Sequence, residues 1–335
     1  MTIPPGNPDY SVNTELFDFQ VSPDGDSEAR VRPSQSPVDP SDEQSAVYLS
    51  DSAPGPFEDT SAARISAERL FTREAKRQSA ELNARADDLY RHRAYEEAVD
   101  TYLKAIDLYQ TNGDISGEAW ALRNLGKARY RQQEYPAAYE SLTRAIALFQ
   151  QISDRRGLAT TRADLGRVLY RQKDFAEARK VFTTALDFLR ELGDNVAVAD
   201  TLNCLGKTAY RMDDLRAARR FMTECVSLYD EECDMNGLCI AQENLARVAY
   251  RQRDLTAARE AQKEHARLCK KLGDRMGAAW SMHDLAQLAF QQGDIAEASS
   301  TLDDSEVQFQ HMNELEGLDA CSRLRAKIRA KSSDL

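Results

Sequence analysis

From about residue 79 onward, apolar residues recur mostly every three or four positions, which is the spacing of one face of an α-helix. In one stretch these positions are Leu122, Leu125, Ala128, Tyr135, Ala138, Leu142, Ala145 and Leu148. A polar turn interrupts the pattern near its middle, as in Arg171-Gln172-Lys173-Asp174. The aspartates that end such turns can cap the following helix, and they are Asp174, Asp214, Asp254 and Asp294. The pattern predicts helices joined in pairs by short turns.

The helix pairs repeat with a period of 40 residues. Cutting after the aspartates 114, 154, 194, 234 and 274, which can cap the next helix, gives the blocks 75–114, 115–154, 155–194, 195–234, 235–274 and 275–314. One aligned column is aromatic: Tyr90, Tyr130, Tyr170, Tyr210, Tyr250 and Phe290. Another is alanine from Ala98 to Ala298, and a third contains only glycine or alanine: Ala86, Gly126, Gly166, Gly206, Ala246 and Ala286. Small residues let paired helices approach closely, and neighbouring pairs must stack to bury their apolar faces.

The columns of block two resemble the tetratricopeptide repeat. The resemblance rests on Asn124-Leu125-Gly126, Tyr130, Glu134-Tyr135, Ala138, Leu142 and Ala145, and it recurs over roughly residues 79–330. It implies an all-α, right-handed superhelical solenoid of antiparallel helix pairs, with six repeats and a capping helix at 315–331. The 40-residue spacing and an early glycine in most blocks are similar to the Pins and LGN polarity adaptors. No GoLoco-like segment follows, so binding to G proteins is not carried over.

Composition divides the chain into two unlike parts. Nine of the ten prolines precede residue 57, and the first 60 residues hold 12 acidic residues against two arginines. Such a segment buries too little apolar surface to offset its chain entropy, so residues 1–60 are expected to form a disordered acidic tail. Residues 61–78 are expected to form a leading helix. Without a long apolar run or signal peptide, the chain is expected to be a cytoplasmic protein.

Two basic columns mark the expected binding surface, because the resemblance implies that first helices line a concave peptide-binding groove. The first column is Lys127, Arg167, Lys207 and Arg247, and four residues later comes the second, Arg131, Arg171, Arg211 and Arg251. A spacing of four places both on one helical face, where they can bind carboxylates. The alternative for the first column is a solvated charged face. For the second it is a favourable position in the last helical turn, near an aspartate.

Amide and aromatic side chains extend this candidate groove. Asn124 and Asn244 belong to a polar column one turn before the first basic column, and they could hold a peptide backbone. Trp120 and Trp280 share one column and could anchor a ligand, with buried packing as the alternative. The expected partner is therefore an acidic or amphipathic segment of another protein.

The acidic tail is itself a candidate ligand of the groove. Leu16, Phe17, Phe19 and Val21 form an apolar cluster flanked by acidic residues. A tethered segment acts at an effective concentration on the order of millimolar, so self-inhibition by the tail is one hypothesis. A solvating tail that recruits another protein is the alternative.

The sequence favours no catalytic, cofactor or metal site. It lacks HExxH, P-loop and GxGxxG motifs, and its four histidines are scattered. The six cysteines form no CxxC pattern and are interpreted as reduced packing residues. Nucleic-acid binding through the arginine columns is the alternative function, but residues 61–335 are nearly neutral and lack the expected positive footprint. The sequence predicts no small-molecule substrate and no membrane insertion, and it leaves self-association open.

Overall fold

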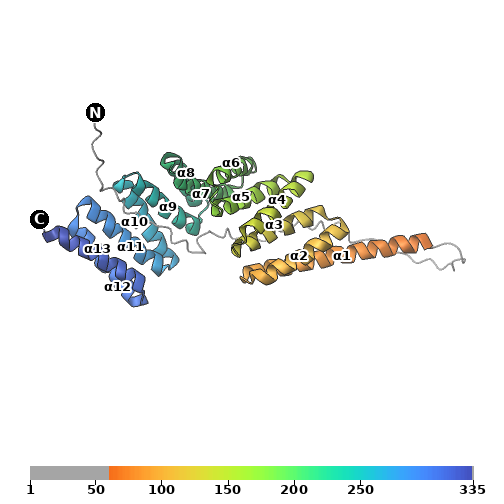
Figure 1. The fold of residues 1–335 in the computed structure, drawn as a ribbon, viewed down its shortest axis with the longest axis horizontal. Coiled ribbons are helices and arrows are strands. Elements are labelled where there is room, and N and C mark those ends of the chain that lie inside the picture. The colour runs from red at the N-terminus through yellow and green to blue at the C-terminus, as the bar shows by residue number, and fades with distance from the viewer. Residues whose placement is uncertain (1–59, 334–335) are drawn as a thin grey trace, which may run out of the picture. The chain divides into compact units, whose positions relative to one another are not determined.

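The computed structural model describes residues 60–333, which form thirteen α-helices and no strand (Figure 1). They divide into two compact units, and the boundary in the sequence lies between Asp194 and Asn195. The first unit holds α1 (Thr60–Arg91), α2 (Tyr95–Asn112), α3 (Ile115–Arg131), α4 (Tyr135–Gln151), α5 (Arg155–Arg171) and α6 (Phe175–Glu191). The second holds α7 (Asn195–Arg211), α8 (Leu215–Glu231), α9 (Met235–Arg251), α10 (Leu255–Leu272), α11 (Arg275–Gln292), α12 (Ile295–Met312) and α13 (Leu315–Ser333).

Consecutive helices pack as antiparallel pairs, and pairs stack on their neighbours. Within each unit every helix contacts the next one in sequence. The first helices of adjacent pairs also touch, as α1 does α3, α3 does α5, and α7 does α9. The predicted all-α architecture of stacked helix pairs is therefore confirmed for the described residues.

Turns of two or three residues separate the helices, and aspartates cap the helices that follow. The carboxylate of Asp154, for example, accepts a hydrogen bond of 2.8 Å from the backbone N–H of Gly157. The same N-terminal cap occurs at Asp114, Asp174, Asp214, Asp234, Asp254, Asp274 and Asp294. The capping role predicted for these aspartates is confirmed, because each satisfies a backbone donor that the helix itself cannot pair.

The glycine and alanine column lies where the two helices of a pair come closest. A Cβ atom added to Gly166 would lie 2.6 Å from the ring of Phe182 on α6. Such an atom would likewise meet Leu142 at Gly126 and Met222 at Gly206. The larger residue on the second helix therefore occupies the space that the glycine leaves open.

Both ends of the array differ from a standard pair. The helix expected over 61–78 is not separate, because α1 runs without a break from Thr60 to Arg91, where no glycine or proline would end it. At the other end α13 packs on α12 and buries Cys321, Leu324 and Ile328 in one core with Phe309, in agreement with the predicted capping helix. The acidic tail lies outside the described residues.

Candidate functional site

The second basic column lies against the aromatic column of the preceding helix pair. Nε of Arg171 donates a 3.1 Å hydrogen bond to the hydroxyl of Tyr130, and the guanidinium lies 5.8 Å from the centre of that ring. Arg251 lies 4.8 Å from the ring centre of Tyr210. The pairs in contact are Arg131 with Tyr90, Arg171 with Tyr130 and Arg251 with Tyr210. Arg131, Arg171 and Arg251 therefore join successive helix pairs. Arg211, the fourth member of the column, lies at the C-terminal end of α7.

Arg167 of the first basic column and Arg123, which lies outside that column, bind a buried carboxylate in the first unit. Asp164 on α5 accepts hydrogen bonds from Nε of Arg123 at 2.8 Å and from Nη1 of Arg167 at 3.0 Å. Its side chain is only 7% exposed. The ammonium of Lys127, one turn after Arg123 on α3, lies 5.2 Å from the ring centre of Tyr90. Arg123, Lys127, Asp164 and Arg167 are named the Asp164 cluster.

The charges of this cluster are not evenly balanced. Burial, aided by the nearby charges of Arg123 and Arg167, lowers the pKa of Lys127 to about 8. Burial alone would raise the pKa of Asp164, but the same two arginines and Lys127 hold it below its usual value. Three cations therefore lie near one ionised carboxylate, while the carboxyl of Asp87 also acts on Lys127.

The polar column joins neighbouring first helices through hydrogen bonds. Nδ2 of Asn124 donates to Oδ1 of Asp87 on α1 at 3.1 Å, and the same oxygen accepts from the hydroxyl of Tyr102 at 2.5 Å. Burial raises the pKa of Asp87. In the second unit, Nδ2 of Asn244 donates to Oδ1 of Asn203 at 2.9 Å. Both asparagines therefore bind protein groups in the same way, across adjacent first helices.

The remaining cations of the first column have different surroundings. Arg247 on α9 forms an ion pair with Glu243 one turn earlier on the same helix. Lys207 lies half-buried on α7. Arg247 also acts electrostatically on Asp284, the partly buried carboxyl on α11 at the position equivalent to Asp164.

The two tryptophans pack against the second helix of their own pair. Trp120 meets Phe149 edge-on with ring centres 4.9 Å apart, and Trp280 meets Phe309 at 5.0 Å. Both indoles are half-buried, and the guanidinium of Arg123 lies 5.5 Å from the Trp120 ring centre. The packing alternative thus has a geometric basis in both units.

Arg123 is a site residue that the sequence pattern misses. Its column does not repeat, since the following blocks have Ala163, Asn203, Glu243 and His283 there. Column alignment finds recurring residues, whereas Arg123 is a single replacement on the first-helix surface. Its position one turn before Lys127 was the available signal.

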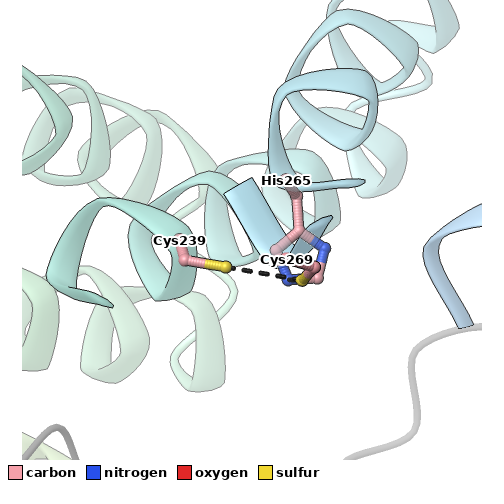
Figure 2. Close-up of side chains that lie close together, drawn as sticks. All are labelled: Cys239, His265 and Cys269. Carbon is pink, nitrogen blue, oxygen red and sulfur yellow. Dashed lines mark hydrogen bonds between the residues drawn. The ribbon is translucent and has the colours of Figure 1, made fainter. Parts of the chain in front are cut away.

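A second group that the sequence pattern misses lies in the α9–α10 pair, where Cys239, His265 and Cys269 converge (Figure 2). The two sulfurs are 3.5 Å apart, and Sγ of Cys269 is 3.4 Å from Nε2 of His265. All three side chains are buried. Both cysteines are free and buried, as expected of reduced packing residues, but the pattern did not predict that they lie together with His265. The spacing of four between His265 and Cys269 was the available signal.

None of the helices described here is long and apolar enough to cross a membrane. No curated protein sequence matches the chain.

Solved structures share the fold at low sequence identity. A signal-transduction ATPase with a tetratricopeptide repeat sensor from Pyrococcus horikoshii matches 80% of this chain and 44% of its own, with 15% identity and a TM-score of 0.66. A Rap protein complexed with competence and sporulation factor matches 76% of this chain and 75% of its own, with 15% identity and a TM-score of 0.53. Pseudomonas aeruginosa PilF matches 76% of this chain and 99% of its own, with 17% identity and a TM-score of 0.56. These likenesses show the fold alone.

A family model identifies the repeats themselves. The model for the tetratricopeptide repeat matches residues 117–191, 157–231 and 237–306, which together make up more than half of the chain. These matches fall on the helix pairs described above. The chain therefore belongs to the tetratricopeptide repeat family.

Proposed function

We propose that this protein is a non-enzymatic scaffold that binds an acidic segment of a partner protein on the α1–α3–α5 face of its first unit. The observation that carries the proposal is the Asp164 cluster, in which three cations lie near one ionised carboxylate. A second carboxylate, supplied by a ligand, would offset the excess positive charge.

The cluster is accessible enough to meet such a ligand. The side chains of Arg123 and Arg167 remain 19% and 28% exposed while they bind Asp164. A guanidinium carries five N–H donors, so an arginine can bind more than one acceptor at a time. A partly desolvated position makes a charge-assisted hydrogen bond stronger than it would be in water.

The low pKa of Lys127 gives the proposal a distinctive signature. A bound carboxylate would stabilise the charged ammonium and raise this pKa from about 8. Binding would then take up protons near pH 8 to 9, and affinity would fall as pH rises through that range. A purely structural ion network would show no such linkage to an added peptide.

The chain's own tail is the proposed competitor for this face. Residues 10–30, outside the described residues, carry five acidic side chains against Arg30 and include the apolar cluster at Leu16, Phe17, Phe19 and Val21. We infer that the tail occupies the site until a partner displaces it, since tethering gives it an effective concentration on the order of millimolar.

The test measures fluorescence anisotropy of a labelled peptide of residues 10–30 with the full chain and with a chain lacking residues 1–59. The shortened chain should bind at least about tenfold more tightly if the tail competes. Peptide binding should weaken with added salt and at pH 9.5. It should be lost in Lys127→Gln and Arg167→Gln. The control Lys173→Gln, which removes an exposed cation from the α5–α6 turn, should bind like the unchanged chain.

Two outcomes count against parts of the proposal. Equal affinity for both chains would reject self-inhibition while leaving the site in place. If the Lys127→Gln and Arg167→Gln variants bind the peptide as tightly as the unchanged chain, the site itself is rejected. Uptake of a single-stranded nucleic acid through the same residues, with a steep salt dependence, would favour the nucleic-acid alternative. The cytoplasmic location stays a prediction from the sequence.

A further inference from the structure

Three departures from the repeat coincide in the α9–α10 pair. Cys239 stands where other blocks have Ala119, Ala159, Ala199 and Ala279. His265 stands in the column of Ala105, Ala145 and Ala185. Cys269 replaces the large apolar residues Tyr109, Phe149, Leu189, Tyr229 and Phe309. Cys269 is smaller than the residues that it replaces and so leaves room for His265, which is larger than alanine. This volume compensation does not explain why all three residues are of types that bind metals.

The hydrogen bonds around His265 orient its ring towards the sulfurs. The hydroxyl of Ser281 on α11 donates its single hydrogen to the carbonyl oxygen of Gly277 at 2.7 Å. The hydroxyl oxygen of Ser281 also lies 2.8 Å from Nδ1 of His265, and with the hydroxyl hydrogen on the Gly277 carbonyl it accepts from the Nδ1–H of the neutral ring. Nε2 then presents its lone pair to the side on which Sγ of Cys269 lies. An outer hydrogen bond of this kind is typical of metal-binding histidines.

The distances suit a small tetrahedral ion. Zinc binds sulfur at about 2.3 Å and histidine nitrogen at about 2.0–2.1 Å, so tetrahedral ligands lie about 3.8 Å apart for two sulfurs and about 3.6 Å apart for sulfur and nitrogen. The corresponding separations here are 3.5 Å between Cys239 and Cys269 and 3.4 Å between Cys269 and His265. All three ligand atoms lie within 4.8 Å of one another. The two separations that involve Cys269 would have to open by a few tenths of an ångström to admit the ion.

We propose that Cys239, His265 and Cys269 bind one zinc-type divalent ion and thereby join α9 to α10. Two sulfurs and one imidazole favour such a borderline-soft ion over calcium or magnesium, which prefer oxygen ligands. The ion would bind both cysteines as thiolates, so any thiol proton still present would be released to solvent, and the two thiolates would balance the two positive charges of the ion. Water would complete the tetrahedron, and Cys239 and His265, at 7% and 8% exposure, give the site its limited contact with solvent.

Cobalt titration of the reduced full chain tests the proposal. One equivalent of Co²⁺ should produce thiolate-to-metal charge-transfer absorption together with the visible bands of tetrahedral cobalt, and Zn²⁺ should displace it. Cys239→Ala restores the residue that other blocks carry, so the fold should tolerate it. His265→Ala leaves a cavity beside the small Cys269, so circular dichroism must first show that this variant is folded. Each should bind at least about tenfold more weakly, in keeping with the loss of one of three protein ligands. Cys225→Ala, in the His265 column of the preceding pair, should bind like the unchanged chain.

A thermal scan with and without zinc separates the folded site from loose binding to unfolded thiols. Zinc should raise the Tm of the unchanged chain and of Cys225→Ala, but not that of His265→Ala. The proposal is overturned if the ligand variants bind cobalt as tightly as the unchanged chain. It is also overturned if the fully reduced chain takes up no ion and the two cysteines instead form only a disulfide on exposure to air.

Discussion

At the scale of single residues, close contact between paired helices depends on where the facing side chain lies. Gly166 faces Phe182, whereas at the equivalent positions of the last pair Ala286 and Leu302 are both fully buried without a glycine. At Gly166 it is therefore the position of the Phe182 ring that leaves no room for a Cβ atom, since leucine is paired with glycine at Gly126 and with alanine at Ala286.

Gly166→Ala should lower the free energy of unfolding by about 1–3 kcal/mol, because its Cβ would lie 2.6 Å from the Phe182 ring. The double variant Gly166→Ala/Phe182→Leu, which copies the last pair, should recover part of this loss. Urea unfolding of the two variants and of Phe182→Leu alone forms a double-mutant cycle. Strictly additive effects would contradict the explanation by the Phe182 ring.

Lys127 should make stability depend on pH. Burial lowers its pKa from 10.5 to about 8 in the folded chain, so between these values the unfolded chain holds a proton that the folded chain has lost. Stability from this group therefore rises with pH across the window and is constant below it. Relative to Lys127→Met, the unchanged chain should gain on the order of 1 kcal/mol between pH 7.5 and 9.5.

Urea titrations at the two pH values measure this difference. Lys173→Met, which alters an exposed lysine in a turn, serves as the control and should show no comparable change. A stability difference between the unchanged chain and Lys127→Met that stays flat with pH would show that Lys127 is better solvated than its surroundings indicate.

At the scale of helices and turns, the sequence predicts the helix pairs well because local signals agree. The capping aspartates, the three-and-four spacing and the short polar turns all mark the same boundaries. The expected break between the leading helix and block one is missing, because the residues there carry no helix-ending signal and α1 continues through them. Local chemistry, and not the repeat alignment, decides where a helix ends.

Turn residues carry backbone strain that a substitution can relieve. Lys173 adopts a φ of 66°, a left-handed conformation that costs a residue with a side chain roughly 1 kcal/mol, while the equivalent Gly293 adopts a φ of 86°. Lys173→Gly should therefore raise the free energy of unfolding by up to about 1 kcal/mol. Lys173→Ala keeps the Cβ and should bring no gain. Equal effects of the two substitutions in urea unfolding would rule out strain as the cause.

At the scale of the whole chain, an array of stacked pairs needs its last apolar face covered. The core of the final pair is completed by Cys321, Leu324 and Ile328 from α13. A chain that ends at Asn313 should lose this cover, melt at a lower temperature and bind an apolar dye. A chain that ends at Lys331 keeps all three residues and should behave like the full chain. Similar melting of the two truncated chains would contradict the capping role of α13.

The sequence predicts less of the candidate sites than of the fold. Repeating columns identified Lys127 and Arg167, but the two groups with the most unusual chemistry depend on residues that occur once. Arg123 and the Cys239, His265 and Cys269 group break the repeat, so alignment of blocks treats them as noise. Their significance lies in which side chains the stacked helices bring together, and that requires three-dimensional contacts.

The tyrosine and arginine contacts have a consequence for how this array can change length. Each joins residues 41 positions apart, as Tyr90 and Arg131 are, or Tyr130 and Arg171. Deleting residues 115–154 would leave Arg171 41 positions after Tyr90, which is the separation that Arg131 now has from Tyr90. Insertions or losses of a full period preserve the contact, whereas another length change between the two residues would shift them out of register. The contact that joins neighbouring helix pairs is thus compatible with the duplication of complete 40-residue blocks, but not with the insertion of part of a block.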